Sequence, residues 1–591
     1  MMEKAPHLQS RIFFVAAIFV ATAMVVVYNL AHWQIVAPRK GNLSGGVTWV
    51  PAPRGNIFDS TGHLLATDIP EYDVKFSPNV VSDDTEQNSI ADQIASILRM
   101  PRSDVLKMVR GKGKNDKYEP ITVPGEGVPQ DVKQALAGIK GVDFDMYYQR
   151  VYPEGSLAAQ TLGFTTNSEQ QVSDGTVIRT HLGTYGIEAT YDKLLEGTPG
   201  YQNLFGYLPE VVADPTQSAE PIPGADLYLT INRAAQKVVE DELAMAIAKY
   251  GAESGRVLVM NPRTGEILAL ANYPTFDLND YAGITDYALY NNDSVSAIYE
   301  PGSVFKAFTM AGALDAHVVG PGSTLNDTGT VQIGNRVIYN ADRKAHGTVD
   351  MTTVLAKSLN VGTAVIANNM GADTFYRYVD AFGFGKLTGV DLPGEVTGEY
   401  PAPGTDYWFK EAHAYVSFGQ GIATTPLQII TAFCAIANNG VMMKPRVVQK
   451  VVQHHPERTI ETQPQVLNRP ISADTADILT QMLVNAIEQS NSEAQIDGYK
   501  VAGKTGTSQV VSQQAIHDPN REIKYSQNET IHSFAGFFPA DDPQLAILVI
   551  LDKPAFGEWG SHTAAPTFSR IGAQLARIFD IPPDNITVAQ R

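Results

Sequence analysis

Residues 256–271 read RVLVMNPRTGEILALA, two short apolar runs separated by the turn segment Asn261–Gly265. Runs of this length, rich in valine and leucine and interrupted by asparagine, proline and glycine, predict a β-hairpin. Two more strands are predicted much later, at Ser533–Phe538 and Leu545–Leu551, and a long helical section lies between. Strands at both ends of one domain, with helices between them, predict an antiparallel sheet assembled from distant segments. The predicted fold class is therefore α+β.

Two amphipathic helices accompany this predicted sheet. Apolar residues recur at helical spacing over Ile231–Tyr250, with Gly251 as the predicted stop, and again over Ala564–Phe579. Ahead of this domain, Gly55–Gly206 is more polar and mixed in pattern. The proline-rich stretch Pro209–Pro223 lies between the two regions and predicts a hinge into the second domain.

The composition is that of an ordinary folded protein. Hydrophobic residues make up 44% of the 591 residues and charged residues 18%, which excludes disordered, collagen-like and coiled-coil classes. The formal net charge of −19 argues against a nucleic-acid partner. The single cysteine, Cys434, excludes an intramolecular disulfide framework and any cysteine-based metal cluster. Because it lies in the apolar run Ala432–Ile436, we interpret it as a buried small hydrophobe.

The N-terminus predicts a membrane anchor. Ile12–Ala31 carries no charged residue and is long enough to cross a bilayer core. Bulky residues follow it instead of a small-x-small cleavage site, so we expect the segment to be retained. The prediction is a cytoplasmic tail at residues 1–11, a transmembrane helix at 12–31, and the rest of the chain outside the cytoplasm.

The first of three chemical motifs is Ser303-Val304-Phe305-Lys306, which follows Pro301-Gly302 at a predicted helix start. Serine and lysine three residues apart share one helix face, so Lys306 can reach the Ser303 hydroxyl. A helix N-terminus disfavours an added positive charge, which predicts a lowered lysine pKa. The backbone N–H of Ser303 is also free to stabilise an oxyanion. Taken alone, such a Ser/Lys pair occurs by chance in a chain this long.

The second and third motifs are weak separately. Ser358-Leu359-Asn360 lies between two helical runs, where serine and asparagine usually bond local backbone but can also project into a cleft. Lys504-Thr505-Gly506-Thr507 reads as a strand whose cation and hydroxyls suit a carboxylate, and whose glycine lets a substrate backbone lie close.

A phosphate-binding loop is the main rival interpretation of the third motif. Residues 498–505 formally match the G-x-x-x-x-G-K-T pattern. Tyr499, Lys500 and Val501 favour a strand at the loop positions, however, and Thr505-Gly506-Thr507 does not begin a helix. The sequence therefore favours the strand.

In the order S-x-x-K, S-x-N, K-T-G, the three motifs are the signature of penicillin-recognising acyl transferases. The sequence closely resembles the class B penicillin-binding proteins from about residue 50 to residue 570. Further similarity lies at Pro53–Asp59, Arg150–Gly155, Gly186–Glu188, Leu229–Asn232 and Ser417–Gly421. One departure is Ser60, which stands where the family usually has an arginine.

The resemblance implies a fold of three parts behind a short cytoplasmic tail. These are the transmembrane helix at 12–31, an elongated mixed pedestal of the penicillin-binding protein dimerisation type at 40–222, and a serine β-lactamase-like transpeptidase domain at 223–580. A C-terminal tail, 581–591, would follow. The transpeptidase domain would hold a five-stranded antiparallel sheet flanked by helices.

The resemblance also implies a peptidoglycan D,D-transpeptidase that works through a serine acyl-enzyme. Ser303 would attack the carbonyl of the penultimate D-Ala of a stem peptide, and Lys306 would take its proton. Ser358, aided by Lys504, would pass a proton to the departing D-Ala. The backbone N–H groups of Ser303 and Thr507 would form the oxyanion hole. An amine of a neighbouring stem peptide would then make the cross-link.

The remaining site residues would bind the substrate. Asn360 would hold Lys306 and a substrate amide, and Thr505, Gly506 and Thr507 would meet the terminal carboxylate. No metal or other cofactor is needed, because the peptide bond broken supplies the energy of the bond made.

The implied partners are peptidoglycan stem peptides on lipid-linked or nascent glycan, β-lactams as covalent inhibitors, and a membrane glycan polymerase of the SEDS family. The implied location is the bacterial cell (inner) membrane, with one span and an extracytoplasmic catalytic domain.

Three alternative functions stay open on the same fold. A D,D-carboxypeptidase shares every motif. A serine β-lactamase would need a water-activating glutamate, and no E-x-x-L-N motif follows Ser358-Leu359-Asn360. A β-lactam sensor would have several membrane segments.

Two further expectations concern structure. Arg54, Asp59, Glu154 and Glu188 are expected to tie the pedestal to the catalytic domain, and an Arg54–Glu188 ion pair is predicted. The polar stretch Ser508–Glu529 between two strands is expected to be either a mobile loop beside the site or a plain surface insertion.

Overall fold

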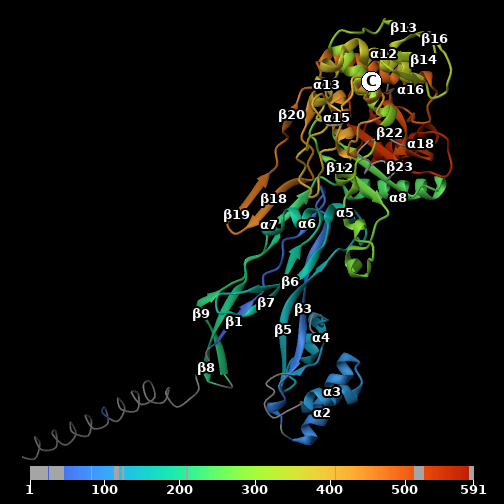
Figure 1. Cartoon of the computed structure of the whole chain (residues 1–591). Coiled ribbons are helices and arrows are strands. Elements are labelled where there is room, and N and C mark those ends of the chain that lie inside the picture. The colour runs from blue at the N-terminus through green and yellow to red at the C-terminus, as the bar shows by residue number, and fades with distance from the viewer. Residues whose placement is uncertain are drawn as a thin grey trace, which may run out of the picture.

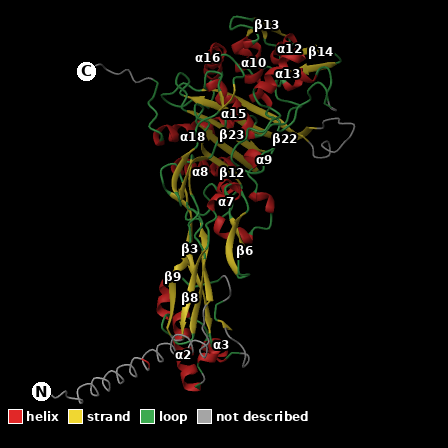
Figure 2. Cartoon of the chain, turned by 90° about the vertical axis from the view of Figure 1, so that its left-hand side faces the viewer, coloured by secondary structure: helices red, strands yellow, loops and turns green. Residues whose placement is uncertain are grey.

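The structure is a computed structural model that describes Met24 and residues 46–81, 83–111, 119–122, 126–207, 210–405, 408–511 and 525–584. The predicted anchor Ile12–Ala31 lies outside the described residues apart from Met24. Among the helices of the described part, none is long and apolar enough to span a bilayer. Below, "pedestal" means residues 46–222 and "C-terminal domain" means residues 223–584. The pedestal is a long stalk with the larger C-terminal domain at one end (Figures 1 and 2).

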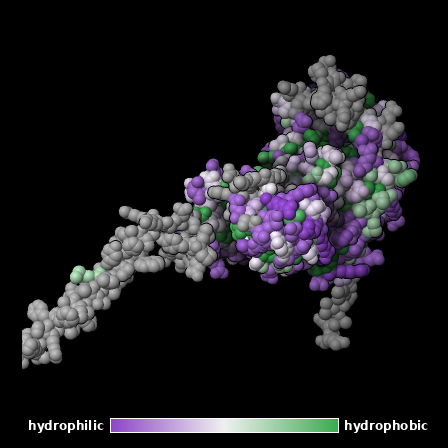
Figure 3. Space-filling model, turned by 90° about the horizontal axis from the view of Figure 1, so that it is seen from below, coloured by the Kyte–Doolittle hydropathy of each residue, from purple (hydrophilic) through white to green (hydrophobic). Residues whose placement is uncertain are grey.

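The pedestal is built on one long antiparallel pair, β3 (Leu64–Phe76) and β5 (Val142–Val151). At the end distant from the C-terminal domain, three helices pack against it: α2 (Asp84–Leu98), α3 (Arg102–Arg110) and α4 (Gln130–Leu136) (Figure 1). Their apolar faces form a small separate core, and the outer surface at this end is largely hydrophilic (Figure 3). This end is therefore a small folded head that keeps its apolar side chains inside.

The predicted hinge at Pro209–Pro223 is wrong over most of its length. It contains β9 (Glu210–Ala219), which pairs with β8 (Gly200–Tyr207), and β8 pairs in turn with β1 (Gly46–Val50). Within this three-stranded sheet β9 is an edge strand. Proline is tolerated on an edge because its missing N–H can face away from the ladder.

A seven-stranded sheet joins the pedestal to the C-terminal domain. Its central strand β10 (Asp226–Leu229) pairs in parallel with β2 (Ile57–Phe58) and antiparallel with β18 (Val448–His454). The hairpin partner of β18 is β19 (Glu457–Glu461), and on the other side β2 pairs with β3, which also pairs with β4 (Glu119–Pro120). Strands far apart in the chain are thus hydrogen bonded across the junction.

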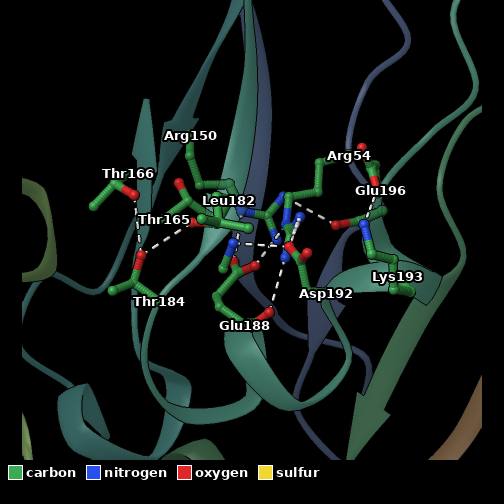
Figure 4. A network of polar contacts seen from close by, with 12 residues as sticks. Arg54, Arg150, Thr165, Thr166, Leu182, Thr184, Glu188, Asp192, Lys193 and Glu196 are labelled. Carbon is green, nitrogen blue, oxygen red and sulfur yellow. Dashed lines mark hydrogen bonds and ion pairs between the residues drawn. The ribbon is translucent and has the colours of Figure 1, made fainter. Parts of the chain in front are cut away.

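Charged groups reinforce this junction and confirm part of the expectation. Asp59 Oδ2 accepts a hydrogen bond of 2.9 Å from the backbone N–H of Arg233, and Glu154 accepts two from the Arg233 guanidinium. The predicted Arg54–Glu188 ion pair is present at 2.7 Å, but both residues belong to the pedestal (Figure 4). Asp59 and Glu154 therefore link the two parts, whereas Arg54 and Glu188 hold the pedestal itself together.

The C-terminal domain contains the predicted five-stranded antiparallel sheet, in the order β12-β11-β23-β22-β21. The strands are β11 (Ser254–Met260), β12 (Ile267–Tyr273), β21 (Ala502–Val511), β22 (Tyr525–Phe538) and β23 (Leu545–Asp552). The predicted hairpin is β11–β12. Helices α8 (Arg233–Tyr250) and α18 (Ala564–Ile578) cover one face of the sheet, and α15 (Pro426–Ala437) covers the other.

The predicted loop Ser508–Glu529 is partly strand. β21 continues to Val511 and β22 begins at Tyr525, while residues 512–524 lie outside the described part. Backbone pairing between the two strands therefore extends into a stretch whose polar residues predicted a loop.

A helical layer lies beyond α15 and holds the first two polar motifs. It consists of η6 (Gly302–Phe305), α10 (Lys306–Asp315), α11 (Met351–Ala356), α12 (Asn360–Met370), α13 (Ala372–Ala381), α14 (Ala412–Val416) and α16 (Ala473–Gln489). Shorter elements complete the described chain: η3 (Pro78–Val80), α5 (Ala159–Leu162), β6 (Thr165–Gln171), β7 (Val177–Gly183), α6 (Gly186–Thr190), α7 (Asp192–Leu195), η4 (Leu278–Gly283), η5 (Tyr287–Tyr290), α9 (Asp293–Ser296), β13 (Thr324–Asp327), β14 (Thr330–Ile333), β15 (Arg336–Tyr339), β16 (Gly347–Asp350), β17 (Met442–Met443), β20 (Val466–Asn468) and η7 (Gly560–His562). Cys434 is buried in α15, as predicted.

Candidate active site

Ser303 lies in the single 3-10 turn η6 that leads into α10, close to the predicted helix start. Gly302 begins this turn with a φ of 55°, a conformation that glycine adopts without strain. Its N–H donates to the carbonyl of Gly419 at 3.1 Å. A Cβ at Gly419 would lie 2.1 Å from the Gly302 oxygen, so only glycine allows the two backbones to meet. The turn that carries Ser303 is thus held from the side by a second loop.

That second loop is Ser417–Gly421, whose sequence similarity was noted above without a structural role. Its Ser417 carbonyl accepts from Thr309 Oγ1 in α10 at 2.8 Å, and the Gly421 N–H donates to Glu300 Oε1 at 2.9 Å. The functional contribution was missed because it depends on contacts across 108 and 121 residues of chain. The two glycines within five residues were the available signal.

Lys306 is fully buried, and its amine is directed to the second motif. Nζ donates to the Ser358 carbonyl at 2.5 Å and to Asn360 Oδ1 at 2.7 Å, and it lies 3.1 Å from Ser358 Oγ. Burial lowers the pKa of Lys306 well below its ordinary value, and the charge of Lys504 lowers it further. The lowered pKa agrees with the sequence prediction, but the cause is desolvation and a second cation instead of the helix N-terminus.

The second motif has an unusual backbone. Ser358 lies between α11 and α12 with a φ of 54°, in the left-handed region that a non-glycine residue adopts at a cost. This turn directs both the carbonyl and the hydroxyl of Ser358 to Lys306. Asn360 is the first residue of α12, and its Nδ2 donates to the Tyr339 carbonyl at 3.1 Å. That contact fixes the amide so that Oδ1 faces Lys306.

The third motif lies on β21, the edge strand of the five-stranded sheet. Lys504 is 3% exposed, and its Nζ lies 3.2 Å from the Thr505 carbonyl and 3.3 Å from Thr505 Oγ1. Burial lowers the pKa of Lys504 to about 7. The strand conformation of this segment rules out a phosphate-binding loop, which requires a glycine-rich turn entering a helix.

Gly506 lets β21 lie against the Ser303 turn. A Cβ on Gly506 would lie 2.3 Å from Ser533 Oγ and 2.9 Å from Val304 Cγ2. Thr505 and Thr507, on the opposite face of the strand from Lys504, are both partly exposed. The structure therefore brings the three motifs together around Lys306. Among the described residues, no group of three or more histidine, cysteine, aspartate or glutamate side chains could hold a metal ion.

Comparison with known families agrees with this geometry. Residues 255–573 match the penicillin binding protein transpeptidase domain, and residues 49–229 match the penicillin-binding protein dimerisation domain. The chain belongs to the penicillin-binding proteins that carry a transpeptidase domain.

Individual relatives match along nearly the whole chain. Stage V sporulation protein D of Bacillus subtilis is 30% identical over 581 residues, covering 95% of this chain and 85% of its own. The peptidoglycan D,D-transpeptidase FtsI of Escherichia coli K12 is 28% identical and covers 95% and 91%. The fold matches penicillin-binding protein 2X from Streptococcus thermophilus with a TM-score of 0.79 at 24% identity, covering 90% of this chain and 80% of that one.

Proposed function

We propose that Ser303 is the nucleophile through which this protein acts as a peptidoglycan D,D-transpeptidase. The observation that carries the proposal is the arrangement of the buried Lys306 amine. In its neutral form this amine has two N–H groups, and the Ser358 backbone carbonyl and Asn360 Oδ1 accept both. Its lone pair is then left to accept a proton from a hydroxyl. A lysine whose pKa is lowered well below its ordinary value by burial, one residue beyond the Ser303 turn, has the properties of a general base.

The reaction then follows in two halves. Ser303 Oγ attacks the carbonyl carbon of the penultimate D-Ala as its proton passes to Lys306, and the tetrahedral oxyanion accepts from the backbone N–H groups of Ser303 and Thr507. The C–N bond breaks, and the terminal D-Ala leaves with a proton relayed by Ser358. In the second half, an amine of a neighbouring stem peptide attacks the ester and releases Ser303.

Substrate binding is assigned to the edge strand. Lys504, Thr505 and Thr507 meet the terminal carboxylate, and Gly506 keeps the strand close to the nucleophile. Asn360 holds Lys306 and also contacts the substrate amide. Support comes from the position of β21 at the sheet edge, where an extended peptide can lie alongside it.

The proposal includes the position of the protein in the cell membrane and its partner there. Residues 12–31 anchor the protein in the cell (inner) membrane by a single span, and residues 1–11 stay in the cytoplasm. Residues 40–222 raise the catalytic domain (223–580) outside, ahead of a tail at 581–591. The apolar N-terminal run and the elongated pedestal support this placement. A membrane glycan polymerase of the SEDS family would supply the glycan that carries the stem peptides.

Labelled penicillin tests the proposal. It should add one ligand mass to the protein, located by digestion to the peptide that holds Ser303. Ser303→Ala should abolish the adduct and shift the melting temperature by only a few degrees, since such a truncation costs about 1 kcal/mol. Label on another residue would overturn the mechanism.

The same assay separates the alternatives. An adduct that disappears within seconds while penicillin is consumed catalytically would indicate a β-lactamase. With stem pentapeptide and an acceptor amine, cross-linked product supports the transpeptidase, whereas shortened peptide without cross-link would indicate a carboxypeptidase.

A further inference from the structure

A buried histidine stands beside the third motif and belongs to none of the three motifs. His532 on β22 is the cross-strand partner of Thr507, so the two side chains lie on the same face of the sheet. The His532 side chain is buried, with Nε2 at 3.0 Å from Thr530 Oγ1 and Nδ1 at 2.9 Å from Thr563 Oγ1. Both ring nitrogens therefore have a fixed hydroxyl partner.

The contacts continue from Thr563 to Thr507 through one peptide group. Thr563 Oγ1 donates to the carbonyl of Trp559 at 3.4 Å, and the His562 N–H donates to the same carbonyl at 2.9 Å. The N–H of this peptide group belongs to Gly560 and donates to Thr507 Oγ1 at 3.0 Å. The peptide between Trp559 and Gly560 is thus held at its carbonyl by two donors and delivers its N–H to the third motif.

Steric fit keeps this peptide in place. A Cβ on Gly560 would lie 2.3 Å from the carbonyl oxygen of Gly506 and 2.9 Å from that of Ser533. Only glycine permits the loop that contains η7 to lie directly on β21 and β22. The approach brings the Gly560 N–H within reach of Thr507.

The proton order along this chain follows from the direction of the Thr563–Trp559 contact. A hydroxyl has one proton, so if Thr563 donates it to the Trp559 carbonyl, Thr563 must accept from His532 Nδ1–H. A neutral imidazole then accepts at Nε2, from Thr530. Burial and the nearby His562 lower the pKa of His532 to about 4, which keeps the ring neutral at neutral pH. At the far end, Thr507 Oγ1 accepts from Gly560, so its own proton must point elsewhere.

We propose that His532 is a positioning residue that acts through Thr563 and the Trp559–Gly560 peptide to make Thr507 a hydrogen-bond donor toward the ligand. A donor at this place favours a carboxylate over an ester or amide of the same ligand, because a hydrogen bond to a charged acceptor is stronger than one to a neutral carbonyl. The inference rests on the proposed function, since it deepens the assignment of Thr507 to the substrate carboxylate. It assigns part of the selectivity for a carboxylate to residues of β22 and of the loop that contains η7, outside the three motifs.

The test is the ratio of acylation rates for benzylpenicillin and its methyl ester, measured on the whole protein. Loss of overall folding lowers both rates together, whereas loss of the donor lowers the ratio. Thr507→Val should lower the ratio by roughly 5- to 13-fold, because the acid loses a hydrogen bond to a charged group while the ester loses a weaker one to a neutral carbonyl. Thr563→Val should lower it several-fold, and Thr563→Ser, which keeps the hydroxyl, should restore it.

His532 itself offers a matched pair of variants. Asparagine places its amide near the position of Nδ1 and can still donate to Thr563, whereas glutamine places its amide near Nε2 and cannot. His532→Asn should therefore keep a higher acid-to-ester ratio than His532→Gln. If Thr507→Val lowers the ratio while Thr563→Val and His532→Gln leave it unchanged, the positioning role is refuted and the proposed function stands. If Thr507→Val itself leaves the ratio unchanged, the carboxylate assignment of the proposed function fails.

Discussion

Replacing Arg150 with methionine should destabilise the pedestal more than replacing Glu188 with glutamine, although both residues take part in the same buried ion pair. Glu188 is fully buried, with Oε1 at 2.7 Å from Arg150 Nε and Oε2 at 2.7 Å from Arg54 Nε. Asp192 Oδ1 lies 2.8 Å from Arg54 Nη1 (Figure 4). Asp68 Oδ1 lies 3.2 Å from Arg150 Nη1 and completes the group. Two cations therefore face three carboxylates.

The number of charges left in each variant predicts which one loses more stability. Glu188→Gln leaves two cations facing two carboxylates and keeps an oxygen that can accept from one guanidinium, so we expect a loss of about 1–3 kcal/mol. Arg150→Met leaves one cation against three carboxylates, and removing one partner of a buried pair costs about 3–5 kcal/mol. At about 2–4 °C per kcal/mol for a domain of this size, the melting temperature should fall by about 2–12 °C and about 6–20 °C.

Thermal unfolding of the protein without residues 1–40 measures both shifts. Lys193→Met is the control, because the Lys193–Glu196 pair lies beside the network but the lysine side chain is 86% exposed, so no shift is expected. A lower melting temperature for Glu188→Gln than for Arg150→Met would refute the charge-balance argument. Melting temperatures of both variants equal to that of the Lys193→Met control would also refute it.

The contribution of Glu188 to the stability of the pedestal should decrease as the pH falls. Burial alone would raise the pKa of Glu188, but the charges of Arg150 and Arg54 and their hydrogen bonds hold it below its ordinary value. A carboxyl with a lowered folded-state pKa contributes stability above its unfolded pKa of about 4.3, and the contribution is lost as pH falls through the folded value. The advantage of the native protein over Glu188→Gln should therefore shrink in acid.

Four further outcomes are expected from the active site and the anchor. Lys504→Ala should lower the second-order rate of penicillin acylation roughly 10- to 150-fold, as one charge-assisted contact is lost; an unchanged rate would remove Lys504 from the site. In the native protein, this rate should decline as pH rises through about 7, where Lys504 loses its charge, and Lys504→Arg should shift the decline to higher pH. Gly506→Ala should abolish acylation by forcing β21 away from Ser533 and Val304, while α-helical circular dichroism stays unchanged. Protein lacking residues 1–40 should still react with penicillin, and a folded but unreactive product would show that the N-terminal segment does more than anchor.

Local patterns predicted the elements of the C-terminal domain well. The hairpin β11–β12 carries its own turn residues, and the helices α8 and α18 carry their own periodicity, so neighbouring residues sufficed. The family resemblance also predicted the contact between Asn360 and Lys306. Local patterns failed where long-range pairing overrides polarity, as in β9 and in the outer part of β21.

The details of the site required the folded chain. Lys306 was expected to lie against Ser303 because both share a helix face, yet its amine bonds the turn at Ser358, which is 52 residues away. The supporting glycine Gly419 and the peptide group at Gly560 act by how closely two backbones approach. Such contacts leave no periodicity in the sequence and appear only when the partner segment is in place.

The seven-stranded sheet at the junction has a consequence for recombination, both in evolution and in engineering. Leu227 of β10 pairs with Ile57 on one side and with Val451 on the other, so a single strand must satisfy two registers contributed by distant parts of the gene. A crossover near residue 229 would join a foreign β10 to a β18 with which it was never matched. Exchange of catalytic domains between such proteins should therefore succeed only when the segments that contain β2, β10 and β18 move together, and the unit of inheritance is larger than the domain.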